Sequence, residues 1–99
     1  MTYRLRFLEE AFNDIEEASL WYAARSSDAH TTFLGEIDQA METILDAPHR
    51  WPNDIENTRR YVCKTFPYSV VYLLEDDVVL VVAVVHSRRR PGYWRERLQ

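Results

Sequence analysis

Apolar and polar residues alternate along the first residues of the chain and then change to a longer period. Thr2–Phe7 alternates with period two, which predicts a half-buried strand. From Leu8 to Tyr22 the apolar residues recur at helical spacing and predict an amphipathic helix over about residues 8–25. The acidic side chains of this helix lie mostly off the apolar stripe, so they are interpreted as a solvated face rather than as paired carboxylates for acid–base chemistry.

A second helix is predicted directly after the first. Ser26-Ser27-Asp28 breaks the apolar period and supplies side chains suited to a helix N-cap. Apolar residues then recur from Phe33 to Leu45, and Pro48 ends the pattern because the residue before a proline is pushed out of the helical region. The short connection predicts an antiparallel helical hairpin.

Strand patterns follow the irregular segment that starts at Pro48. Residues 59–65 predict a strand with Tyr61 and Cys63 on one face, and residues 68–74 predict another. A polar turn at residues 75–77 leads into a third strand over residues 78–86, forming a hairpin. This last strand opens with eight apolar residues, a pattern typical of a strand that is covered on both faces.

The element order β-α-α-β-β-β predicts a single α+β domain over residues 1–99. We expect the helical hairpin to pack on one face of a four-stranded, mainly antiparallel sheet with strand order 1-4-3-2, followed by a basic C-terminal tail. Two helices cover only one face, while the central strand is apolar on both. Either the loop and the tail cover the second face, or a partner chain does, and we expected an obligate partner on this ground.

Composition and charge narrow the function. The chain has 99 residues, one cysteine and a formal net charge of −4, which argues against a disulfide framework and against wrapping nucleic acid with the whole surface. Residues 1–57 carry a net charge of −8 and residues 58–99 a net charge of +4, which indicates a separate cationic face. Charged residues interrupt the N-terminal segment and no apolar run is long enough to span a bilayer, so we expect a cytoplasmic protein without a membrane partner.

The candidate chemistry is cationic and aromatic. No glycine-rich phosphate loop, zinc-protease motif or Cys/His cluster is present in the sequence, so no cofactor and no metal site is expected. Arginine forks bind phosphate or carboxylate, and aromatic rings stack on bases or anchor protein interfaces. The residues that could form such a surface are Arg59, Arg60, Lys64, His86, Arg88, Arg89, Arg90, Tyr93, Trp94 and Arg95.

Two segments, FPYSVVY (Phe66–Tyr72) and AVVHSRRRPGYW (Ala83–Trp94), make the chain resemble a known family. Together with the element order and the length, they are similar to the RelE/ParE superfamily of toxins from type II toxin-antitoxin systems. The resemblance covers essentially the whole chain. It implies a cognate antitoxin protein that forms a hetero-oligomer with the chain.

The resemblance leaves two targets open. ParE-like members inhibit DNA gyrase, which would make Arg88, Arg89, Arg90, Tyr93 and Trp94 target-binding residues. RelE-like members cleave mRNA on the ribosome by metal-independent attack of a 2′-hydroxyl on the adjacent phosphate. That activity would make Arg60, Lys64, His86, Arg88 and Tyr93 catalytic residues. The sequence favours the ParE-like branch, because Ser69 stands where RelE-like nucleases often carry an arginine and because the chain is acidic. A non-toxic interaction module is the third hypothesis.

Overall fold

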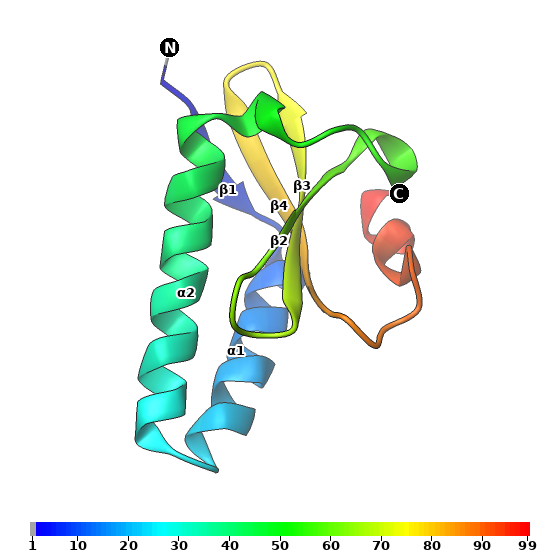
Figure 1. Cartoon of the computed structure of the whole chain (residues 1–99). Helices are drawn as coiled ribbons and strands as arrows, with labels where there is room; N and C mark the ends of the chain where they lie inside the picture. The colour runs from blue at the N-terminus through cyan, green and yellow to red at the C-terminus, as the bar shows by residue number, and fades with distance from the viewer. Residues whose placement is uncertain (1) are drawn as a thin grey trace.

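A computed structural model describes residues 2–99 and contains two helices packed on a four-stranded sheet (Figure 1). The sheet order is β1-β4-β3-β2, with β1 parallel to β4 and the other pairs antiparallel. The elements are β1 (Arg4–Phe7), α1 (Glu9–Ala23), α2 (Ser27–Asp46), β2 (Arg59–Val62), β3 (Tyr68–Glu75) and β4 (Val78–His86). The predicted α+β class, element order and strand order are confirmed.

The helical hairpin forms where the sequence pattern predicts it. The Ser26 hydroxyl caps α2 by accepting a hydrogen bond from the Ala29 N–H at 3.2 Å. Phe33, Ile37 and Ile44 of α2 are buried against the sheet. Pro48, the second residue after α2, is also buried, and its ring is compatible with the short turn that follows but not with a continued helix.

A β-bulge in β4 determines how its long apolar run is divided between the two faces of the sheet. Val71 pairs with Ala83 and Tyr72 pairs with Val81, so Val82 is an extra residue without a partner on β3. As a result Val81 and Val84 belong to the core beneath the helices, whereas Val82 and Ala83 belong to a second cluster. Strict alternation would have placed Val84 on the wrong face, and the bulge restores it to the helix side.

The second face of the sheet is covered within the chain. Trp94 of the tail is buried there against Val71, Val82 and Ala83, and Ile55 of the loop packs beside them. Figure 1 shows the C-terminal tail on the other side of the sheet from α2. Of the two alternatives that the sequence leaves open, the loop and the tail cover this face rather than a partner chain. This face therefore gives no separate argument for an obligate partner.

Two predicted strands are shorter than expected. The strand predicted from Thr2 begins at Arg4, and the strand predicted over residues 59–65 ends at Val62. After Cys63 the chain turns, and the Glu36 carboxylate of α2 accepts hydrogen bonds from the N–H groups of Thr65 at 2.8 Å and of the next residue at 3.3 Å. This side chain on a distant helix therefore sets the turn. No helix within residues 2–99 has the length and apolarity that crossing a membrane requires.

Candidate functional site

The C-terminal end of β4 delivers a cationic turn, residues 86–90, to the surface. Three bonds hold its backbone. The Ser87 N–H donates to the carbonyl of Pro67 at 2.8 Å, the Arg89 N–H donates to the carbonyl of His86 at 3.0 Å, and the Arg88 N–H donates to Nδ1 of His86 at 3.1 Å. Each arginine of the turn is exposed. The turn therefore presents a cluster of positive charge on a backbone that the rigid strand end fixes.

Gly92 redirects the chain from the cationic turn into the tail. Its φ is +75°, a left-handed conformation that glycine adopts without strain. A Cβ atom there would lie 3.2 Å from Nε of Arg95 and 3.4 Å from Cδ1 of Ile55. The tail then forms a short 3₁₀ segment, Tyr93–Leu98, whose residue Trp94 is only 5% exposed.

Trp94 is accordingly a packing residue in this structure. The sequence pattern placed it in the target-binding set, but its indole closes the second apolar cluster and is not available at the surface. Tryptophan is large and mostly apolar, so its burial on this sheet face stabilises the fold. The structure therefore gives Trp94 a packing role, and its role in target binding stays a prediction.

Tyr93 joins the cationic turn to the tail. The Arg89 guanidinium lies 3.8 Å from the centroid of the Tyr93 ring, and the Arg97 guanidinium lies 5.6 Å from the same centroid. Burial, with a smaller effect of the Asp14 charge, raises the pKa of Tyr93, although both arginines act in the opposite direction. The Tyr93 hydroxyl therefore stays protonated near neutral pH, where it is poorly suited to serve as a general base.

Two hollows flank the cationic turn. The larger, of about 520 Å³, lies between α1 and the turn and is lined in part by Asp14, Glu17, Trp21, Tyr68 and Tyr93. The smaller, of about 90 Å³, lies on the opposite side and is lined in part by Thr58, Arg60, Ser69, Ser87 and Trp94. His86 and Arg89 line both. The cationic turn is therefore the shared rim of two surfaces of different character.

The structure divides the residues that a nuclease would need. Arg60 and His86 meet in the smaller hollow, together with Ser69, and His86 also lines the larger hollow with Tyr93. Lys64 is exposed beyond the end of β2, and neither Lys64 nor Arg88 lines either of these two hollows. By contrast Arg88, Arg89 and Arg90 lie together on the exposed turn. The arginines predicted for target binding thus lie together on one turn, whereas the residues predicted for catalysis are spread over both hollows and the exposed surface.

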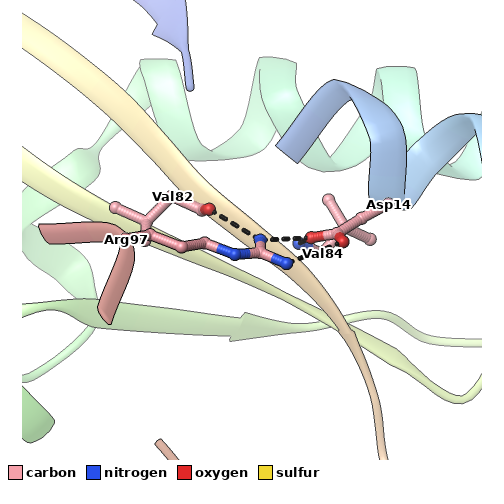
Figure 2. Close-up of polar contacts among 4 residues, drawn as sticks. All are labelled: Asp14, Val82, Val84 and Arg97. Atoms are coloured by element: carbon pink, nitrogen blue, oxygen red, sulfur yellow. Dashed lines mark hydrogen bonds and ion pairs between the residues drawn. The ribbon is translucent and has the colours of Figure 1, made fainter. Parts of the chain in front are cut away.

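One feature of the site escaped sequence analysis. Asp14 was grouped with the solvated acidic face of the first helix, but its side chain is only 14% exposed and pairs with Arg97 of the tail. Figure 2 shows Arg97 reaching across β4 to Asp14. An aspartate at this helical position gives no sequence signal of its partner, because the two residues are far apart in the chain. Within residues 2–99 no group of three or more His, Cys, Asp or Glu side chains could hold a metal ion.

Comparison with known proteins identifies the family. Residues 5–91 match a family model described as the ParE toxin of the type II toxin-antitoxin system parDE. Toxin ParE2 of Mycobacterium tuberculosis is 27% identical over 93 residues, which cover 93% of this chain and 89% of that protein.

Solved structures share the fold. A chain from the chromosomal ParDE toxin-antitoxin system of P. aeruginosa has a TM-score of 0.75 at 9% identity, covering 86% of this chain and 96% of that one. A mutant of the E. coli toxin RelE in the free state has a TM-score of 0.69 at 19% identity and covers both chains completely. A chain of the intact E. coli RelBE toxin-antitoxin complex has a TM-score of 0.61 at 20% identity, covering 88% of this chain and 99% of that one. Because the family model matches residues 5–91, most of this chain, the chain belongs to the ParE toxin family of type II toxin-antitoxin systems.

Proposed function

We propose that this toxin arrests growth by binding a protein target, DNA gyrase, through the cationic turn. The observation that carries the proposal is the exposure of Arg88, Arg89 and Arg90 together on a turn that the end of β4 fixes. Arginines on a turn whose backbone is already fixed lose little backbone entropy on binding, and their guanidinium groups can form bidentate contacts with carboxylates. The larger hollow lies beside this cluster, and its aromatic side chains, Trp21, Tyr68 and Tyr93, add apolar contact area.

The nuclease hypothesis has weaker support from the geometry. Cleavage by 2′-hydroxyl attack needs a proton acceptor and phosphate-binding cations around one phosphate. Here Ser69, rather than an arginine, lies beside Arg60 in the smaller hollow, and Tyr93 lies in the other hollow with a raised pKa. Three basic side chains, Arg60, His86 and Arg89, line the smaller hollow, but neither Lys64 nor Arg88 lines it.

We also propose that a cognate antitoxin neutralises the toxin. Similar folds occur in the ParDE system of P. aeruginosa and in the intact RelBE complex of E. coli, which supports a protein antitoxin here. An acidic segment would complement the cationic turn and compete with the target for it. Mixing the toxin with the product of a neighbouring acidic reading frame, and measuring release of growth arrest, tests this pairing.

The deciding experiment measures supercoiling by purified gyrase as toxin is added. We expect inhibition by the wild-type protein, and its loss in the triple variant Arg88→Ala/Arg89→Ala/Arg90→Ala. A charge-matched control replaces Arg4, Arg6 and Arg50, which are exposed outside the turn, with alanine. The control is expected to inhibit as the wild type does, because its net charge equals that of the triple variant while the turn is intact.

A parallel measurement follows transcript integrity on translating ribosomes with the same three proteins. Gyrase inhibition with intact mRNA supports the proposal. Unchanged supercoiling at excess toxin, together with cleaved mRNA, would exclude the proposal and establish the nuclease alternative.

A further inference from the structure

The edge of β4 is only partly covered by its neighbouring strand. β1 pairs with β4 as far as Phe7 opposite Val81, and within residues 2–99 no strand continues the pairing over residues 82–86 on that side. Side chains take the place of the strand. Oδ2 of Asp14 accepts a hydrogen bond from the Val84 N–H at 2.9 Å, and Nη1 of Arg97 donates to the Val82 carbonyl at 3.1 Å (Figure 2). Two backbone groups that would otherwise lack partners are thereby satisfied.

The same two side chains bind each other. Nη1 of Arg97 lies 2.7 Å from Oδ2 of Asp14, and Nη2 lies 3.0 Å from Oδ1, a bidentate geometry. The Arg97 and Asp14 side chains are 17% and 14% exposed, whereas the Arg4–Asp77 pair spans 3.6 Å and is largely exposed. A shielded, bidentate pair constrains its two elements more tightly than an exposed contact does. Asp14 and Arg97 thus fasten the tail to α1 and to β4 at one point.

This ion pair also bears on the cationic turn. Arg97 and Arg89 both place a guanidinium near the ring of Tyr93, at 5.6 Å and 3.8 Å from its centroid. Two like charges near one ring repel each other, and the Asp14 carboxylate offsets this repulsion because it contacts Arg97 directly. Without Asp14, Arg97 would lose its anchor and Arg89 would face an uncompensated positive charge.

We propose that Asp14 and Arg97 are positioning residues that fix the orientation of Arg89 for its target. Their ion pair holds the tail across the free edge of β4, the tail holds Tyr93, and Tyr93 holds the guanidinium of Arg89 at the rim shared by both hollows. Asp14 lies within the segment that matches the family model, whereas Arg97 lies beyond its end at residue 91. The last residues of the chain are therefore part of the binding apparatus. The identity of the target in this inference rests on the proposed function, but the positioning itself does not.

A first experiment tests positioning without any target. The protons on Cδ of Arg89 experience the ring current of Tyr93, so their NMR resonance reports the contact. Asp14→Asn removes the charge while keeping the shape, and Arg97→Lys keeps the charge while removing the bidentate fork. The control is Arg50→Ala, which removes a guanidinium 5.4 Å from the centroid of Trp51, outside this network.

We expect both Asp14→Asn and Arg97→Lys to move the Arg89 resonance toward its value in an unfolded peptide. The control should leave it in place. Dispersed backbone spectra identify which variants are folded, and the Arg97→Lys variant decides the matter if Asp14→Asn fails to fold. An Arg89 resonance that stays at its wild-type position in a folded variant would overturn the proposal.

A double-mutant cycle then tests whether Asp14 acts through Arg89. Asp14→Asn and Arg89→Ala should each raise the toxin concentration needed for half-inhibition of gyrase by about tenfold. The double variant should need no more toxin than the weaker single variant, because a displaced Arg89 has already lost its contact. A loss of about a hundredfold, the product of two independent effects, would refute positioning. If the wild-type protein leaves supercoiling unchanged, the gyrase proposal fails, and the Arg89 resonance alone decides the role of the ion pair.

Discussion

Replacing Trp94 with alanine tests whether this side chain packs on the sheet in solution or is exposed and free to bind a target. The Trp94 side chain is 5% exposed and fills the cluster formed with Val71, Val82 and Ala83. Truncating a buried tryptophan costs about 3–5 kcal/mol. Because the cluster is small and the tail can settle into part of the vacated volume, we expect the lower end, about 3 kcal/mol. That is a large share of the roughly 5–15 kcal/mol that stabilises a domain.

The matched control is Trp21→Ala. Trp21 is 52% exposed at the lip of the larger hollow, so its truncation should change the free energy of unfolding by less than about 1 kcal/mol. Urea denaturation followed by circular dichroism measures both variants. We expect the midpoint for Trp94→Ala to fall without a change in slope, since the unfolded state exposes a similar area. A loss below about 1 kcal/mol for Trp94→Ala would show that the tail does not pack on the sheet in solution.

Three further predictions concern the polar groups of Tyr72, Cys63 and Glu36. Tyr72→Phe should cost about 1–3 kcal/mol, because the Tyr72 hydroxyl donates to the Pro48 carbonyl at 2.6 Å. Burial raises the pKa of Tyr72 from 10.0 to about 12. The hydroxyl therefore contributes fully to the free energy of unfolding below pH 10, and this contribution is lost as the pH rises toward 12. Unfolding of the wild-type protein should show this loss, and unfolding of the phenylalanine variant should not. Burial, and then the Glu36 charge, raises the pKa of Cys63 to about 11. At pH 8 the folded protein should therefore carry roughly a hundredfold less thiolate than an unperturbed cysteine does, and a thiol reagent should label it correspondingly slowly. Labelling as fast as that of the protein in urea would contradict this prediction. Glu36→Gln should lower the melting temperature by a few degrees, about 1 kcal/mol, because the turn at Thr65 loses a charged acceptor; an unchanged melting temperature would argue against that contact.

The periodicity of the sequence predicted the fold because each element carries a strong local signal. Ser26 marks the start of α2, Pro48 marks its end, and the apolar run of β4 indicates a central strand. The same run predicts that both faces of β4 are covered, which favours a central place for this strand in the sheet. These features are local, or they follow from a single rule of sheet packing.

The features that sequence analysis missed depend on distant partners. A period-two pattern cannot reveal the bulge at Val82, because eight consecutive apolar residues show no alternation to disrupt. The side chain of Trp94 follows a cluster of arginines, so its position suggested the surface. Only the left-handed turn at Gly92 directs it back onto the sheet. Asp14 and Arg97 are separated by most of the chain, and nothing near either residue indicates the other.

The two halves of the chain carry net charges of opposite sign, which the total of −4 does not show. The acidic first half and the basic second half meet where Asp14 of α1 pairs with Arg97 of the tail. That contact pairs one charge of each sign and provides hydrogen-bond partners for two backbone groups of β4. Within residues 2–99 no ion pair includes Arg88, Arg89 or Arg90. A chain with a net charge of −4 can therefore keep a concentrated positive turn without spreading positive charge over its surface. We expect such a local field to orient the toxin toward a complementary acidic patch and to attract nucleic acid only weakly, as the proposed recognition of a protein target requires.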